Sequence, residues 1–267
     1  MQILSSGWLA APAATPDKRL IAAIGDPHGM TGHLDALLAA IESAAETLGQ
    51  DREIVFMGDY IDRGPDPLGA IDRVMRTPRS VALMGNHDDW LVDLIEDRLS
   101  DERAGDWMQN GGLKTLDRMG VARDTLAGGV ATLAPAVRQA LGPERIAFLR
   151  GLRMHTRIGP YLFVHAGIDP RKRLRDQKRE DLLWIREPFL SAQTWLYRDL
   201  VVVHGHTPKT AEVCRHRIGT DTGGFKSGVL TAALLHDNRV RFICAVGDTA
   251  KRPWNPERLP TGVRVSA

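Results

Sequence analysis

Residues 20–29 read LIAAIGDPHG, and they join a run of five apolar residues to a polar turn. A short, continuous apolar run that ends at a glycine is typical of a buried strand. The same arrangement recurs at 54–57 and at 81–84, and apolar residues recur at helical spacing over 34–48 and 68–75. This alternation of strand and helix predicts an α/β fold in which parallel strands carry helices on their faces.

The second half of the chain predicts a more antiparallel arrangement. Apolar runs at 161–164 and 200–203 indicate two further strands, while 228–235 and 239–245 flank a polar turn in the manner of a hairpin. Residues 90–157 instead carry apolar residues at helical spacing without strand-like runs. We expect this stretch to form a helical insertion.

The two ends of the chain have weaker patterns than its middle. Residues 1–17 are expected to form a loose lead-in segment, and residues 252–267, which contain three prolines, an exposed tail. A length of 267 residues suits one large domain, so we expect a single domain over the whole chain.

Composition argues against several classes of protein. The formal net charge of +2 is too small for an obligate nucleic-acid binder. The sequence has no run of 18 apolar residues and no basic start of a signal peptide, so we expect a cytoplasmic protein without a membrane span. Cys214 and Cys244 form no C-x-x-C motif and indicate a reducing compartment. The basic segment 171–179 is either a solvated loop face or a charge that attracts a phosphorylated partner.

Five short polar motifs follow the strand-like runs: GDPHG (25–29), GDYIDRG (58–64), GNHD (85–88), HAG (165–167) and GHT (205–207). Ligands of open α/β sheets bind beyond the carboxyl ends of the strands, so we expect these motifs to converge. Carboxylate, imidazole and amide ligands without thiolate suit Mn²⁺, Fe or Zn²⁺. Two such ions about 3.5–4 Å apart could activate water, align it with a phosphorus atom and offset the growing charge.

In this order, the first three motifs resemble the phosphoprotein phosphatase family of calcineurin-like metallophosphoesterases. The likeness spans roughly residues 20–235, and three further stretches are similar to the bacterial and phage members: WMQNGG (107–112), WIRE (184–187) and DTG (221–223). The resemblance implies an αββα sandwich of two mixed β-sheets flanked by helices, with the helical insertion over the site. Pro27 departs from the apolar residue common at this position, although it is compatible with an extended turn.

The resemblance also implies two divalent metal ions, most often Mn²⁺. It assigns six metal ligands, two to the first ion, one bridge and three to the second ion: Asp26 and His28, then Asp59, then Asn86, His165 and His206. The nucleophile would be a hydroxide that bridges the two metals, so no phospho-enzyme is expected.

Four further residues take catalytic roles by the same resemblance. His87 would be the general acid that protonates the leaving oxygen, and Asp62 would orient it and keep it protonated. Arg63 and Arg186 would bind the phosphoryl oxygens through bidentate hydrogen bonds. Asp88 stands where eukaryotic members have Glu, and we assign it no role in the chemistry.

Several of these residues have simpler interpretations when taken singly. Asp26 and Asp59 could cap helices or stabilise turns, and His165 could be a satisfied core histidine. Arg186 could form a surface ion pair. His204 competes with His206 for one ligand position, and we choose His206 because it fits the Gly-His-Thr pattern of the family.

Three functions remain open. The first is a phosphatase that acts on phosphorylated Ser, Thr or Tyr residues of proteins, and on small phosphate esters. The second is a symmetrical diadenosine-tetraphosphate hydrolase, although those enzymes tend to have Ala-Arg in place of Asp62-Arg63. The third is an inactive phosphoprotein-binding scaffold, which the presence of all six ligands and His87 disfavours.

Overall fold

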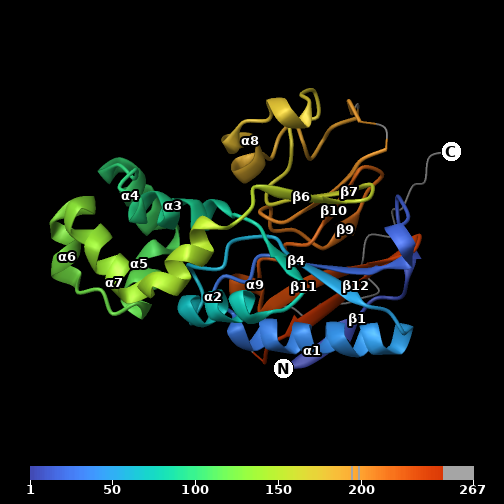
Figure 1. Ribbon diagram of the computed structural model, residues 1–267, viewed down its shortest axis with the longest axis horizontal. Coiled ribbons are helices and arrows are strands. Elements are labelled where there is room, and N and C mark those ends of the chain that lie inside the picture. Colours follow the sequence, from blue (N-terminus) through green and yellow to red (C-terminus); the bar gives the residue numbers. More distant parts are fainter. Residues whose placement is uncertain (194, 198, 249–267) are drawn as a thin grey trace.

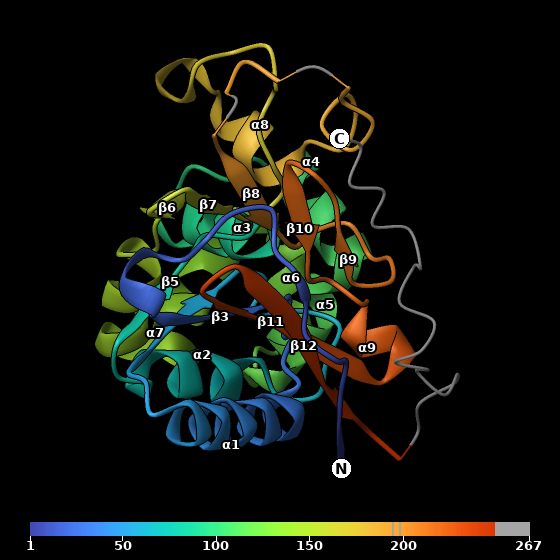
Figure 2. The ribbon, with the colours of Figure 1, turned by 90° about the vertical axis from the view of Figure 1, so that its right-hand side faces the viewer.

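Two β-sheets pack face to face between layers of helices in the computed structural model, which describes residues 1–193, 195–197 and 199–248 (Figures 1 and 2). The seven strands of the first sheet are β1 (Gln2–Ser5), β2 (Leu9–Ala10), β3 (Leu20–Ile24), β4 (Arg52–Phe56), β5 (Ser80–Ala82), β11 (Val229–His236) and β12 (Arg239–Val246). The five strands of the second sheet are β6 (His155–Ile158), β7 (Tyr161–Val164), β8 (Val201–His204), β9 (Glu212–Val213) and β10 (Arg217–Gly219).

Both sheets are mixed, as the resemblance implied. The first has the order β1-β12-β11-β3-β4-β5, with β2 paired to β12 beside this path, and the second has the order β6-β7-β8-β10-β9. The predicted strands β3, β4 and β5 pair in parallel, and the predicted hairpin of β11 and β12 is antiparallel. Strands β7, β8 and β10 also pair in parallel, so the second sheet is less antiparallel than the sequence indicated.

The core lies in layers that follow from the apolar runs. Ile21, Val55 and Phe242 of the first sheet meet Phe163 and Val203 of the second in one buried cluster. Because every residue of β3 is buried, both faces of this strand contribute to packing. Each buried Ile, Leu, Val or Phe side chain stabilises the fold by roughly 1.5–3 kcal/mol through removal of apolar surface from water.

Helices α1 (Thr31–Leu48) and α2 (Pro67–Arg76) cover the outer face of the first sheet, where Figure 2 shows α1 as the lowest layer. Leu34, Leu37 and Ile41 of α1 are buried at the predicted helical spacing. The helix ends at Gly49, whose left-handed backbone (φ 60°) lets its N–H reach the carbonyl groups of the last turn. The shorter helix α8 (Arg179–Trp184) lies on the second sheet, and α9 (Gly224–Ser227) precedes β11.

The helical insertion forms the lobe on the left of Figure 1. It comprises α3 (Asn86–Ile95), α4 (Asp101–Trp107), a π-helical turn (Met108–Gly112), α5 (Leu113–Arg118), α6 (Arg123–Ala127) and α7 (Gly129–Arg150). Helix α7 is interrupted at Gly142, whose backbone lies outside the helical region (φ 73°, ψ 166°), and the helix begins again at Pro143. The expected insertion was too long, since β6 begins at His155 within it. Its residues, HTRI, are mostly polar and only partly buried, so no apolar run revealed this edge strand.

The expectation of a loose segment over residues 1–17 was wrong. Strands β1 and β2 both pair antiparallel with β12, and a short 3₁₀ turn (Pro16–Lys18) follows them. Strand β1 escaped prediction because its side chains are largely exposed at the edge of the sheet. The expected tail at 252–267 lies outside the described residues. Among the helices of the described part, none is long and apolar enough to cross a membrane.

Candidate metal centre

The predicted ligands all lie just beyond the carboxyl ends of strands. Asp26 and His28 follow β3, Asp59 follows β4, and Asn86 begins α3 shortly after β5. From the second sheet, His165 follows β7 directly and His206 follows β8. All six side chains are at most 6% exposed. Two sheets therefore bring five separate chain segments to one buried point.

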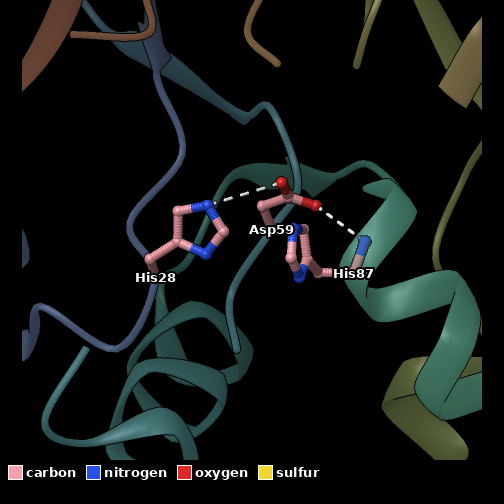
Figure 3. Close-up of side chains that lie close together, drawn as sticks. All are labelled: His28, Asp59 and His87. Carbon is pink, nitrogen blue, oxygen red and sulfur yellow. Dashed lines mark hydrogen bonds and ion pairs between the residues drawn. The ribbon is translucent and has the colours of Figure 1, made fainter. Parts of the chain in front are cut away.

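Asp59 lies between His28 and His87 (Figure 3). Its Oδ2 lies 3.5 Å from His28 Nε2, and its Oδ1 lies 3.5 Å from His165 Nε2. Two groups of potential ligands contain it: His28, Asp59 and His87 in one, and Asp26, Asp59 and His165 in the other. A carboxylate common to both groups could serve two metal positions.

Asn86 supplies the second point of convergence. Its Oδ1 lies 2.9 Å from His165 Nε2 and 2.9 Å from His206 Nδ1. Asp26 accepts a hydrogen bond from the His206 backbone N–H at Oδ2, whereas its buried Oδ1 has no hydrogen-bond partner in the described part of the chain. Burial and the nearby carboxylates of Asp221 and Asp59 raise the pKa of Asp26. A buried carboxylate oxygen without a hydrogen-bond partner and a neutral amide oxygen are both suitable ligands for a divalent cation.

The histidines are held in the form that metals require. His28 Nδ1 lies 2.7 Å from the Ile61 carbonyl and His165 Nδ1 lies 2.8 Å from the Met57 carbonyl, so each Nδ1–H donates to the backbone. Their Nε2 lone pairs then point toward Asp59. Burial lowers the pKa of His28 and of His206 to about 3, and it also lowers the pKa of His165. Neutral imidazoles can bind a metal without first losing a proton.

The turns at the site need unusual backbone conformations. The φ angles of Asp59 and His206 are 56° and 61°, in the left-handed region. A Cβ at Gly64 would lie 1.7 Å from the His28 carbonyl oxygen, and one at Gly85 would lie 2.1 Å from Asp59 Oδ1. The glycines of the motifs therefore permit close approach of backbone and ligand.

Asp88, to which we assigned no role in the chemistry, connects the second and third motifs through hydrogen bonds. Its carboxylate accepts hydrogen bonds from the backbone N–H groups of Asp59 (2.7 Å), Tyr60 (3.0 Å) and Gly85 (3.0 Å). Asp88 thus fixes the turn that carries the central ligand and acts on the chemistry only through backbone structure.

His87 stands beside the ligands but has a different partner. Its Nδ1 lies 2.5 Å from Asp62 Oδ2, and its backbone N–H donates to Asp59 Oδ1 (3.0 Å). A carboxylate accepts hydrogen bonds, so the Nδ1–H of His87 donates to Asp62, and Nε2 is the ring nitrogen that can donate to a substrate. This arrangement agrees with a general acid oriented by Asp62.

A cleft of about 1160 Å³ opens over Asp59, Asn86, His87 and His206. Four cationic residues line it, and within the described residues none of them forms an ion pair: Arg63, Arg186, Lys209 and Lys226. Asp59 is the one acidic residue of the described lining. The exposed aromatic side chains of Trp184 and Phe225 also line the cleft. The surface suits an anionic ligand that carries apolar groups.

The basic segment 171–179 is largely neutralised by its own surroundings. Arg171 pairs with Asp169, Lys172 pairs with Asp181 at 2.6 Å, and Arg179 pairs with Asp89. These ion pairs favour the interpretation of a structured, solvated loop.

This donor cluster is that of a metal-dependent hydrolase. The sequence pattern of the calcineurin-like phosphoesterases matches residues 19–252, and the chain belongs to this family, whose members use divalent metals.

Three relatives illustrate the breadth of the family. The chain is 27% identical over 216 residues to serine/threonine-protein phosphatase 1 of Salmonella typhimurium, covering 79% of this chain and 90% of the relative. It is 41% identical to the symmetrical bis(5'-nucleosyl)-tetraphosphatase of Bordetella pertussis, but over only 66 residues, or 24% of this chain and 23% of the relative. The crystal structure of a "putative diadenosine tetraphosphatase" superposes with a TM-score of 0.59 at 20% identity, covering 84% of this chain and 93% of that one, which supports the fold.

Proposed function

We propose that this chain is a dinuclear-metal phosphomonoester hydrolase that removes phosphate from Ser or Thr residues of proteins. The observation that carries the proposal is the buried pair of His87 and Asp62, joined at 2.5 Å beside the ligand cluster. A serine or threonine alkoxide is a poor leaving group, so its departure requires a proton donor. A phosphoanhydride releases a phosphate, which leaves readily without one.

The residues of the site divide the work of this reaction. The metals, when bound by Asp26, His28, Asp59, Asn86, His165 and His206, would supply an activated water and offset phosphoryl charge. His87 gives its Nε2 proton to the leaving oxygen, while Asp62 holds the ring through Nδ1.

Arg63 and Arg186 bind the phosphoryl oxygens from the walls of the cleft. In this structure, Arg63 Nη1 instead donates to His28 Nε2 at 2.9 Å. Because a metal would take that lone pair, the Arg63 guanidinium would turn toward the substrate when the centre is loaded.

The choice of metal and of substrate rests on chemistry and on relatives. The ligand set of carboxylate, imidazole and amide suits Mn²⁺ best, with Fe or Zn²⁺ as alternatives. The relative named as a protein phosphatase matches 79% of this chain, whereas the tetraphosphatase of Bordetella pertussis matches 24%. A scaffold without activity would have no need for a buried acid pair directed at the cleft.

A direct comparison of substrates tests the proposal. The purified protein with added Mn²⁺ should hydrolyse a phosphoseryl peptide with a higher kcat/KM than diadenosine tetraphosphate. His87→Asn should lower kcat on the phosphopeptide by about 10²–10⁴-fold, the usual contribution of a general acid, without loss of metal. A strong preference for the dinucleotide would overturn the assignment, and no turnover of any phosphate ester would revive the scaffold.

A further inference from the structure

The helical insertion reaches into the acid pair through two side chains. Trp107 Nε1 donates to Asp62 Oδ2 at 2.8 Å, on the same oxygen that accepts from His87. Thr115 Oγ1 donates to Asp62 Oδ1 at 2.6 Å and accepts from the Asp62 backbone N–H at 2.9 Å. Trp107 and Thr115 are both fully buried. Both oxygens of the Asp62 carboxylate therefore accept hydrogen bonds from side chains of the insertion.

The same segment also holds the next residue, Arg63. The Arg63 Nε donates to the Asn110 carbonyl at 3.2 Å, and Lys114 Nζ donates to the Arg63 carbonyl at 2.8 Å. Gly111, at φ 122°, lies against Arg63, where an added Cβ would come within 2.9 Å of its Cγ. The segment adopts a π-helical turn here, a conformation that is often found at functional sites.

Asp62 and Arg63 need such support because of their own backbone. Their φ angles are 68° and 63°, and two consecutive non-glycine residues in the left-handed region are strained. Such a conformation persists only where surrounding contacts determine it. The contacts that do so come from residues 107–115, about fifty positions further along the chain.

We propose that Trp107 and Thr115 are positioning residues for the general acid. By fixing both oxygens of Asp62, they fix the His87 ring and direct its Nε2 at the leaving oxygen. The proposal rests on the function proposed for His87, and it gives a physical purpose to the WMQNGG motif, whose first residue is Trp107. The insertion therefore positions the general acid and also lines the cleft.

Leaving groups of different basicity separate this role from simple structural support. Trp107→Phe removes one hydrogen bond to Asp62 and Thr115→Val removes two, and both variants keep most of the side-chain volume. With β-glycerol phosphate, an alkyl ester that needs the acid, kcat should fall about 10- to 100-fold, a part of the full contribution of a general acid. With p-nitrophenyl phosphate, which leaves without a proton, kcat should fall less than about threefold.

Three further measurements make the test decisive. Thr115→Ser, which restores the hydroxyl, should recover most of the kcat lost on the alkyl ester. Thr132→Val makes the same change on an exposed threonine of the insertion, whose hydroxyl donates to the Thr125 and Gly129 carbonyl groups, and it should change neither rate. Metal content and the KM for both substrates should stay at the wild-type values.

An equal loss of kcat on both esters, or a loss of bound metal, would overturn the proposal and leave Trp107 and Thr115 as structural residues. The outcome is independent of the natural substrate. Wild-type protein that hydrolyses both esters but no phosphopeptide would refute the protein phosphatase, while the effect of the two variants on the alkyl ester would still decide the positioning role.

Discussion

Asp59 is the residue on which both candidate metal positions depend. Its two oxygens face His28 and His165 separately, and its backbone is held by Asp88. We predict that Asp59→Asn, which replaces one ligand oxygen by an amide nitrogen, weakens both metal sites together. Metal analysis after dialysis should show the loss of both equivalents.

Asp72→Asn is the matched control, because it makes the same substitution at a carboxylate that forms an ion pair with Arg145. This variant should retain full metal content. A variant at Asp59 that lost a single equivalent would argue against a bridging role for this carboxylate.

His204, the alternative to His206 as a candidate ligand, lies in a different environment from the ligand cluster. Its ring packs on Phe189 with 5.0 Å between centroids, and its Nδ1–H donates to the Gly205 carbonyl at 3.0 Å. Its buried Nε2 has no hydrogen-bond partner within the described residues. Burial lowers the pKa of His204 to about 3, so this histidine stays neutral in the folded protein.

This depressed pKa predicts a pH-dependent contribution to stability. Between pH 6.5 and about 3 the unfolded chain binds a proton at His204 that the folded chain does not, so acid favours unfolding. The contribution is complete above pH 6.5 and is lost at up to about 1.4 kcal/mol per pH unit below it. In metal-free protein, urea unfolding of His204→Gln should therefore show a shallower loss of stability between pH 6.5 and pH 4. Parallel curves for variant and wild type would contradict a buried neutral histidine.

Within the helical insertion, the π-helical turn (Met108–Gly112) is the part that we expect to affect substrate binding. A Cβ at Gly111 would press on Arg63, and the backbone there has a φ that side chains rarely adopt. We predict that Gly111→Ala displaces Arg63 and weakens the binding of inorganic phosphate about 10-fold or more, the cost of losing a charged hydrogen bond. Competitive inhibition by phosphate measures this change.

Gly105→Ala provides the control in the preceding helix, because an added Cβ at Gly105 meets no atom within 4 Å. Alanine favours the helix interior over glycine, so this variant should bind phosphate normally and be slightly more stable. Equal phosphate binding by both alanine variants would show that the turn does not govern Arg63.

Some strands could be predicted from the sequence and others could not. Strands β3 and β7 were clear because central strands are buried on both faces and read as continuous apolar runs. Strands β1 and β6 were missed because edge strands carry polar, partly exposed side chains. The motifs indicated which candidate ligands would converge, because strand ends meet at one edge of a sheet. The contact of Trp107 with Asp62 joins residues 45 positions apart and has no local sequence signature.

Positive charge gathers in one cleft, where four cationic side chains form no ion pair with any residue that the structure describes. Lys209 and Lys226 line it together with Arg63 and Arg186, although the net charge of the chain is only +2. Such a field attracts anionic substrates and is screened by salt. We predict that kcat/KM for a phosphopeptide falls as ionic strength rises toward physiological values, and that Lys209→Ala with Lys226→Ala lowers it several-fold at low salt.

The control for this prediction is Lys178→Ala, an exposed lysine that does not line the cleft. Stopped-flow or steady-state rates over a salt series would measure the dependence. If the double variant kept the salt dependence of the wild type, the attraction would have to come from the metals and the two arginines alone.

The left-handed backbone of the site has a consequence for the stability of the fold. His28, Asp59, Asp62, Arg63 and His206 all have positive φ angles, at a cost of about 1 kcal/mol each. Glycine would relieve that cost and abolish the chemistry. The site therefore holds backbone strain that the rest of the fold must offset, and its functional side chains are kept at a cost in stability.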